Sequence, residues 1–172
     1  MKHPFTCTDG DIELRPLSAK DSELYRQLRN QEHNRSCFLF SGTITKEGQQ
    51  QWYENYLKKP NDYMFSIYNQ KGQFLGGAAL YDIAETSAEF GRILIDKTAA
   101  GKKGIGCQTL LLLCDFARKQ LGLKALHLEV FKDNLPAVKT YEKVGFQVLK
   151  CYPHSDTGKM LYYMEKNLEV SL

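Results

Sequence analysis

The stretch GKKGIG, from Gly101 to Gly106, places three glycines and two lysines just before an apolar run, TLLLLC. The first amide groups of a helix have no partners within the helix and carry partial positive charge. Glycine allows the backbone to come close to a ligand, and Lys102 and Lys103 add attraction for an anion. These residues predict a phosphate or diphosphate site at a helix start, with a simple glycine turn as the alternative.

Two familiar nucleotide loops require residues that this stretch lacks. A P-loop needs Lys and then Ser or Thr, but Cys107 and Gln108 follow Gly106. A dinucleotide loop of the form GxGxxG fits Gly104 and Gly106, but Thr109 stands at the third glycine position. Neither class fits the segment.

A second segment, NLPAVKTYEKVGF (134–146), has helical spacing. Asn134, Ala137 and Tyr141 are three and then four residues apart, so they share one face of a helix. Gly145 suits the end of that helix. Taken alone, a small residue and a tyrosine on one face are typical of packing.

Composition limits the classes of protein and of partner. The 172 residues, with 42% hydrophobic and 25% charged, predict one domain over 1–172. A net charge of +3 is too small to indicate nucleic acid as a partner, but it suits a phosphorylated ligand. The longest apolar run is too short to span a membrane, which predicts no membrane partner.

The cysteines and histidines indicate a compartment and exclude metal motifs. The N-terminal residues lack the apolar region of a secretory signal, and no cysteine pair has C-x-x-C spacing. We therefore expect free thiols in a reducing cytoplasm and no bound metal.

The elements that must position these residues follow from periodicity. Helices are predicted after the Ser18 cap, after the Thr45 cap (46–59), over 104–121 and over 134–145, and an irregular loop over 30–42. The predicted fold class is α+β, with a single mixed, mostly antiparallel twisted sheet of about seven strands and about four helices. The predicted strands are 12–17, 63–69, 74–83, 88–96, 124–131, 146–152 and 159–168.

In this order, three segments resemble the GCN5-related N-acetyltransferase (GNAT) superfamily. They are ILID (93–96), GKKGIG (101–106) and the run 134–146, and the likeness extends over nearly the whole chain. One departure is Gly101, where the family usually has Gln or Arg. The resemblance implies an enzyme, an acetyl-CoA-dependent N-acetyltransferase, in which two central parallel strands splay to admit the coenzyme.

The resemblance also assigns residues to the coenzyme. The pyrophosphate would lie on the glycine segment and the pantetheine arm along the strand before it, with Asn134 and Ala137 nearby and Tyr141 facing the thioester sulfur. The expected coenzyme residues are Ile93, Leu94, Ile95, Gly101, Lys102, Lys103, Gly104, Ile105, Gly106, Asn134, Ala137 and Tyr141.

The expected reaction is direct attack of an amine on the thioester. An amine with a pKa near 10.4 is almost wholly protonated at pH 7, a penalty of about 4 to 5 kcal/mol that a base must address. Glu89 is the first candidate for that base, on the face that strict alternation gives also to Ile93 and Ile95. A solvated glutamate at a strand end is its alternative, and His127 with Glu129 could act through water. Tyr141 is the expected proton donor to the departing sulfur.

The acceptor is less well defined by the sequence. The segments LRNQEHNR (28–35) and ITKEGQQQWYENYL (44–57) resemble the branch that acetylates ribosomal-protein N-termini, spermidine and nucleotide-linked amino sugars. Asn30, Arg35 and Phe38 are the expected acceptor residues, with Phe40 as a further stacking partner, and a nucleotide-linked amino sugar is the first candidate. A protein N-terminus or a polyamine remains open, as do a non-catalytic acyl-CoA-binding domain and either a monomer or a homodimer.

Overall fold

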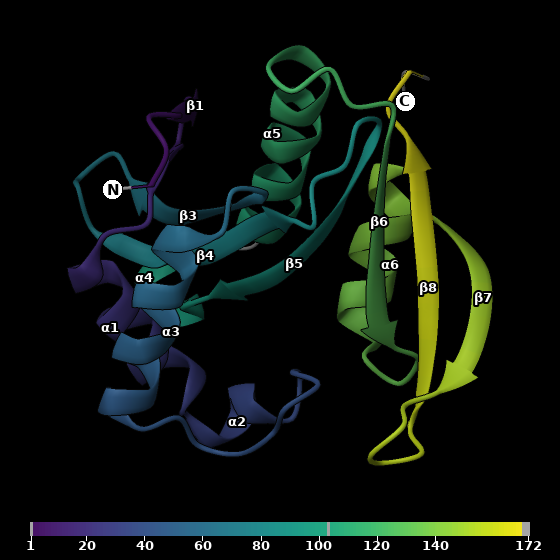
Figure 1. The fold of residues 1–172 in the computed structure, drawn as a ribbon, viewed down its shortest axis with the longest axis horizontal. Coiled ribbons are helices and arrows are strands. Elements are labelled where there is room, and N and C mark those ends of the chain that lie inside the picture. Colours follow the sequence, from purple (N-terminus) through teal and green to yellow (C-terminus); the bar gives the residue numbers. More distant parts are fainter. Residues whose placement is uncertain (1, 103, 170–172) are drawn as a thin grey trace.

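The computed structural model describes residues 2–102 and 104–169 (Figure 1). Their strands form one eight-stranded sheet in the order β1-β2-β3-β4-β5-β6-β8-β7. The neighbouring strands are antiparallel except β5 and β6, which are parallel. The strands are β1 (Cys7–Asp9), β2 (Ile12–Pro16), β3 (Asp62–Asn69), β4 (Phe74–Tyr81), β5 (Ser87–Ile95), β6 (Ala125–Phe131), β7 (Gln147–Pro153) and β8 (Met160–Asn167).

Six helices accompany this sheet in the described part of the chain. Those at Ser18 and Thr45 begin where their caps predicted: the Ser18 hydroxyl accepts from the Asp21 amide and the Thr45 hydroxyl from the Gly48 amide. The helices are α1 (Ala19–Arg29), α2 (Glu32–Arg35), α3 (Lys46–Lys58), α4 (Lys97–Ala100), α5 (Ile105–Lys119) and α6 (Leu135–Val144).

The predicted fold class is confirmed, with short additions that the sequence did not indicate. The strand β1 adds an eighth strand at one edge of the sheet. The helices α2 and α4 have four residues each, and α2 lies within the expected loop 30–42. Such short elements carry too few periodic residues to be recognised from sequence.

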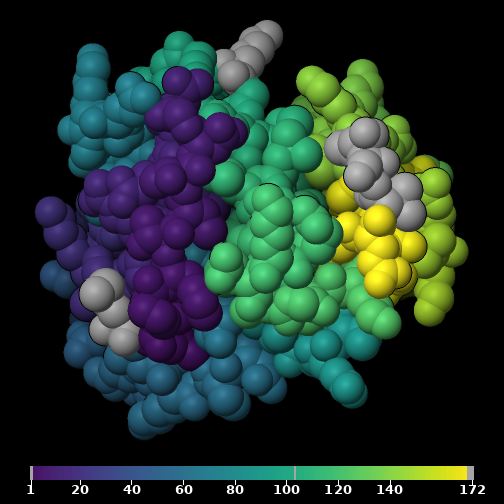
Figure 2. All heavy atoms as spheres, turned by 90° about the horizontal axis from the view of Figure 1, so that it is seen from above, coloured from purple at the N-terminus to yellow at the C-terminus, as the bar shows by residue number. Residues whose placement is uncertain are grey.

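Helices cover the two faces of the sheet unequally. On one face, α1 and α3 pack on β3, β4 and β5, where Tyr25, Tyr56 and Met64 form a small buried cluster. On the other face, α5 and α6 cover a larger core that includes Leu110, Leu113 and Val138. Figure 2 shows α5 between the N-terminal segments and the C-terminal strands.

The parallel pair is short, and this positions the site. The strands β5 and β6 pair only from Ser87 with Ala125 to Glu89 with His127. Beyond that pair the two strands diverge toward their C-terminal ends, while β5 stays paired with β4 as far as Ile95 (Figure 1). The edge of β5 that faces β6 therefore has no strand partner after Glu89 among the described residues.

A bulge in β5 corrects one expectation from the sequence. Two steps along β4, from Gly77 to Ala79, correspond to three along β5, from Leu94 to Gly91. The extra residue lies around Arg92, whose φ of 55° is left-handed.

The faces exchange at this bulge. Leu94 joins Glu89 and Gly91 on the α1/α3 face, whereas Ile93 and Ile95 pack on the α5 side. The prediction that Glu89 shares a face with Ile93 and Ile95 is therefore wrong, because strict alternation does not survive an inserted residue.

Candidate active site

The expected coenzyme segments meet at the start of α5. The N-cap of α5 is Gly104, with φ of 94° and no side chain to cap the first turn. Gly101 ends α4 with φ of 66°, and a Cβ at either glycine would meet nothing within 4 Å. A Cβ at Gly106 would touch Ile93 at 3.9 Å, so the helix start lies against the diverging end of β5. The helix therefore begins beside the free edge of β5, and the amides of its first turn have no partner within the helix.

The charges around this segment are exposed. Lys102 forms an ion pair with Asp11 at 2.6 Å, and both side chains are about half exposed. Exposed pairs of this kind contribute little and exchange readily, so Lys102 is available to an incoming phosphate. Lys103 lies outside the described residues.

The bulge residue Arg92 is held on both sides. Its guanidinium makes two bonds with the carboxylate of Asp62, at 2.7 and 2.8 Å, and Asp62 is buried. Its backbone carbonyl accepts a 2.8 Å bond from the hydroxyl of Tyr25. The guanidinium also lies over the ring of Tyr81, 4.3 Å from its centroid. These contacts offset the strain of a left-handed non-glycine residue and fix the backbone where β5 leaves β6.

The expected proton donor, Tyr141, lies on α6 and contacts β5 next to the point where β5 and β6 separate. Its ring meets the Phe90 ring edge-on at 6.1 Å, and Phe90 directly follows Glu89. Burial raises the pKa of Tyr141 to about 12, and the nearby Cys37 adds to the effect. The phenol is therefore protonated across the neutral and mildly alkaline range.

The expected base, Glu89, lies at the last pair before the strands separate. Tyr81 is its partner on β4 and His127 its partner on β6. Burial raises the pKa of Glu89 above its usual 4.5; Tyr81 and His127 oppose that shift, and Glu129 adds to it. A raised pKa makes the carboxylate a stronger base and narrows the gap between its pKa and that of the acceptor ammonium.

The other two basic candidates lie on the uncovered part of the sheet. His127 stacks on Tyr163 at 5.8 Å, and its Nδ1 is buried without a partner among the described residues. Glu129 accepts a 2.6 Å bond from the hydroxyl of Tyr152. A role of either residue in proton removal through water stays a prediction.

The two expected catalytic groups reach the strand separation from opposite faces of the sheet. Glu89 shares the α1/α3 face with Tyr81, whereas Tyr141 packs with Phe90 in the α5/α6 core. A proton acceptor on one side and a donor on the other suit a reaction in which the amine enters from one face and the thiol departs toward the other.

The remaining α6 residues are placed at the start of that helix. Asn134 is the N-cap of α6, and its side chain accepts from the amide of Ala137 at 3.5 Å. Ala137 is half-buried against the larger core. The cap already explains Asn134 structurally, and a contact with the coenzyme would be additional.

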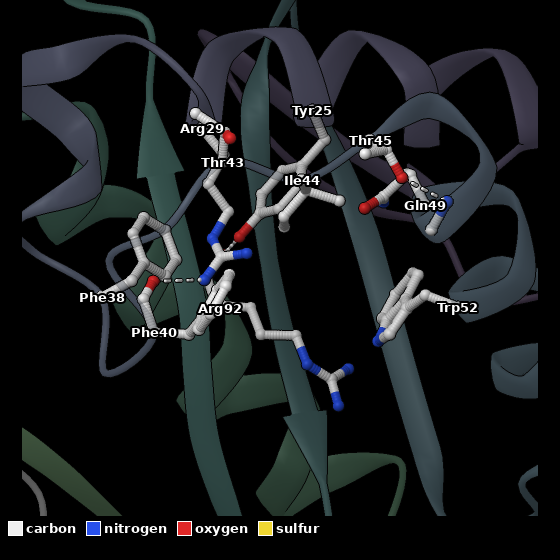
Figure 3. Close-up of a pocket in the computed structure, with 11 residues that line it drawn as sticks. Tyr25, Arg29, Phe38, Phe40, Thr43, Ile44, Thr45, Gln49, Trp52 and Arg92 are labelled. Carbon is white, nitrogen blue, oxygen red and sulfur yellow. Dashed lines mark hydrogen bonds between the residues drawn. The ribbon is translucent and has the colours of Figure 1, made fainter. Parts of the chain in front are cut away.

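The expected acceptor residues separate in the structure. Phe38 lines a cavity of about 500 Å³ between α1, α3 and β5 (Figure 3). Asn30 instead closes the base of the loop, where its side chain donates to the carbonyl of Ile44 and accepts from its amide, both at 2.8 Å. Arg35 lies on α2 outside that lining, and its Nε is buried without a partner in the described part of the chain.

Sequence reasoning missed most of the residues that line this cavity. They come from α1, the loop after α2, α3 and β5, and only Phe40 was considered with Phe38. A usable signal for the bulge beneath the cavity was the pair Gly76–Gly77 in β4, because a Cβ at Gly76 would overlap the carbonyl oxygen of Leu94. The missed lining residues are Tyr25, Arg29, Thr43, Ile44, Thr45, Gly48, Gln49, Trp52 and Arg92.

The described residues form neither a metal-binding cluster nor a membrane-spanning helix. Among residues 2–102 and 104–169, no three or more His, Cys, Asp and Glu side chains gather closely enough to hold a metal ion. In the same part of the chain, no helix combines the length and apolarity needed to cross a membrane.

Two parallel strands, β5 and β6, separate beside the helix α5, which begins at Gly104. This arrangement is typical of the acyl-CoA-dependent N-acyltransferases. Residues 11–147 match the family model "Acetyltransferase (GNAT) domain". "Probable N-acetyltransferase YjcK" of Bacillus subtilis (strain 168) is 30% identical over 147 residues, 78% of this chain and 80% of that protein. The chain therefore belongs to the GNAT acetyltransferases and is an N-acetyltransferase whose acetyl donor is acetyl-CoA.

Solved structures show the same fold at low sequence identity. Spermidine N-acetyltransferase from Vibrio cholerae, in complex with CoA and spermine, has a TM-score of 0.85 and 19% identity, covering 94% of this chain and 98% of that one. A GNAT-family acetyltransferase from Bacillus anthracis has a TM-score of 0.81 and 15% identity, covering 96% of this chain and all of that one.

Proposed function

We propose that the chain acetylates a primary amine by direct attack on acetyl-CoA at the point where β5 and β6 separate. One observation carries this proposal: the parallel pair ends at Glu89 and His127, which leaves one edge of β5 free beside the start of α5. An extended pantetheine arm can add to that edge as a strand would, and the diphosphate can bind the helix amides.

The coenzyme residues follow from that placement. The free edge of β5 includes Ile93, Leu94 and Ile95, and the diphosphate would lie on the amides that begin at Gly104. Gly101 in place of Gln or Arg removes a side-chain contact, and its left-handed φ explains why glycine suits this position. Lys102 would exchange Asp11 for a phosphate.

Glu89 would remove the proton of the amine, directly or through a water. Its raised pKa lessens the gap between base and ammonium, but a gap remains. The half-buried surroundings of Glu89 also disfavour the charged form of an incoming amine, which lowers the pKa of its ammonium.

Tyr141 would stabilise the departing thiolate by donating a hydrogen bond. A thiol pKa near 8.5 and a phenol at about 12 make complete proton transfer uphill by about 3.5 pKa units, or about 5 kcal/mol. A bond that strengthens as charge develops on sulfur avoids that cost and acts mainly in the transition state.

The acceptor is a primary amine, and its identity is the finer part of the proposal. A nucleotide-linked amino sugar is supported by the aromatic and cationic residues of the Phe38 cavity. A polyamine is supported by the fold likeness to the Vibrio cholerae spermidine N-acetyltransferase, and a protein N-terminus remains a third candidate.

The direct test measures thiol release from acetyl-CoA in the presence of amine panels. We expect Tyr141→Phe to lower kcat about 10 to 100-fold, because a charged hydrogen bond contributes about 1.5 to 3 kcal/mol, and to leave the KM for acetyl-CoA within about twofold. Tyr63→Phe, which alters a partly buried tyrosine on β3, serves as the control. Unchanged turnover in Tyr141→Phe would remove Tyr141 from the mechanism.

We also propose a reducing, cytoplasmic location. All five cysteines, at positions 7, 37, 107, 114 and 151, are free thiols. A monomer and a homodimer both remain open, and sedimentation analysis distinguishes them.

A further inference from the structure

The cavity between α1, α3 and β5 has an unusual charge composition for an enzyme that acetylates amines. Its lining includes Arg29 and Arg92 but no carboxylate. Figure 3 shows both guanidinium groups directed into the space, with the Trp52 ring across from them. A purely cationic acceptor would meet repulsion here.

The two arginines differ in how their charges are balanced. Arg92 is neutralised by the two bonds to buried Asp62. Arg29 makes no ion pair with any described carboxylate; its Nη2 donates to the carbonyl of Phe40 at 3.0 Å. Its guanidinium also lies 4.3 Å from the centre of the Phe38 ring.

The surroundings of Arg29 make its isolated charge costly. Burial lowers the pKa of Arg29, with only Tyr25 opposing that shift. A guanidinium offers five donors in a planar fork that matches phosphate and carboxylate, and one of them is occupied by a protein acceptor in the described structure. An anion entering the cavity would supply the missing counter-charge.

A chain of neighbouring residues leads from the cavity lining to the expected catalytic base. The guanidinium of Arg92 lies over the Tyr81 ring, and Tyr81 is paired with Glu89 across β4 and β5. All three residues lie on the α1/α3 side of the sheet, so an acceptor whose amine is at Glu89 can extend into the cavity.

We propose that Arg29 binds an anionic group of the acceptor, a phosphate or a carboxylate carried by the same molecule as the reacting amine. The inference rests on the proposed function and narrows its acceptor to amines of mixed charge. The aromatic rings of Phe38 and Trp52 add flat apolar surface beside the anion, while Glu89 receives the amine at the other end. A polyamine, which has only positive charges, does not fit this arrangement.

The wild-type enzyme provides the first test, which needs no variant. Thiol release is measured for amines matched in shape but not in charge: glucosamine with glucosamine 6-phosphate, and a dipeptide amide with the same dipeptide as free acid. Spermidine is the cationic comparison. We expect kcat/KM at least tenfold higher for the anionic member of one pair, and the preferred pair identifies phosphate or carboxylate. Equal rates within both pairs, or a preference for spermidine, overturn the proposal.

The second test assigns the preference to Arg29. We expect Arg29→Gln to raise the KM of the preferred anionic amine at least tenfold with little change in kcat, and to leave its neutral partner unchanged. Arg29→Lys should retain part of the preference, since it keeps the charge and loses the fork. Arg118→Gln removes an exposed arginine on α5 as the control. Equal losses for both members of the pair would make Arg29 merely structural and contradict the proposal.

A binding measurement separates this inference from the proposed reaction. Calorimetry with CoA present measures the binding of glucosamine 6-phosphate and the dipeptide acid to wild type and to Arg29→Gln, independently of turnover. Arg29-dependent binding without acetyl transfer would contradict the reaction and support the anion site. Acetyl transfer with no preference for anionic amines would support the reaction and contradict the anion site.

Discussion

The start of α5 and the Arg29 cavity lie on either side of β5 and are built from different parts of the chain. At α5 the expected contacts are backbone amides exposed by glycines within one short segment, Gly101 to Gly106. In the cavity they are side chains from α1, the loop after α2, α3 and β5. A ligand shared by a whole family can be bound by backbone geometry, while the ligand that distinguishes a member is recognised by side chains that vary freely.

The bulge at Arg92 connects the two regions, so breaking its support should have the largest effect. We expect Asp62→Asn to lower the free energy of unfolding by about 3 kcal/mol, because it leaves the half-buried Arg92 charge without a counter-ion. Urea denaturation measures the change. Asp115→Asn, which disrupts exposed pairs on α5, should cost less than about 1 kcal/mol. Similar losses in the two variants would mean that the bulge does not depend on the ion pair.

Glu89 lies where the two regions meet, and the next effect concerns chemistry rather than folding. We expect Glu89→Gln to lower kcat about 100-fold or more at pH 7, the usual range for a general base. The acid limb of the wild-type kcat/KM profile should also lie above the pH expected for an ordinary glutamate, since burial raises the pKa of Glu89.

Variants of the neighbouring groups test that assignment. His127→Asn and Glu129→Gln should each lower kcat less than Glu89→Gln does, because these two residues on β6 would act only through a water. A larger loss in either variant would transfer the role of base to that residue.

The glycines give a matched pair of variants for the coenzyme side. Gly104 (φ 94°) and Gly122 (φ 65°) both have left-handed backbones, and a Cβ at either would meet nothing within 4 Å. Alanine should cost each about 1 to 2 kcal/mol in stability. We expect only Gly104→Ala to raise the KM for acetyl-CoA as well, several-fold, with the KM for the amine unchanged. An equal KM for acetyl-CoA in both variants would show that the start of α5 does not bind the coenzyme.

The same contrast explains what the sequence could predict. The glycine segment, the 134–146 helix and the order of the strands along the chain are local patterns, so the fold class and the helix that carries Tyr141 followed from them. The bulge did not follow, because it depends on Asp62 and Tyr25, which are far from Arg92 in sequence. Arg29 was missed for a similar reason: its lack of a counter-ion is visible only once the carboxylates have positions in space.

The smallest expected effect concerns the stability of the site itself. The pKa of Glu89 is higher in the folded protein than its ordinary value, near 4.5. In the pH window between these two pKa values, the folded state therefore binds more protons than the unfolded state. Stability then falls as pH rises through the window, because the charged carboxylate is partly desolvated in the folded protein. At neutral pH the wild type carries this cost, and Glu89→Gln does not.

We therefore expect Glu89→Gln to melt at a slightly higher temperature than wild type at pH 7, by about 2 °C or less because Glu89 is only half-buried, and to match it near pH 4. Scanning calorimetry at the two pH values measures the difference. A difference that is the same at both would come from the glutamine and not from the charge. Suppose that Glu89→Gln loses turnover and gains stability only at the pH where the wild-type carboxylate is ionised. The acceptor side then keeps a charged base at a cost to the stability of the fold. The glycines at the start of α5 carry no such cost, because they bury no charge.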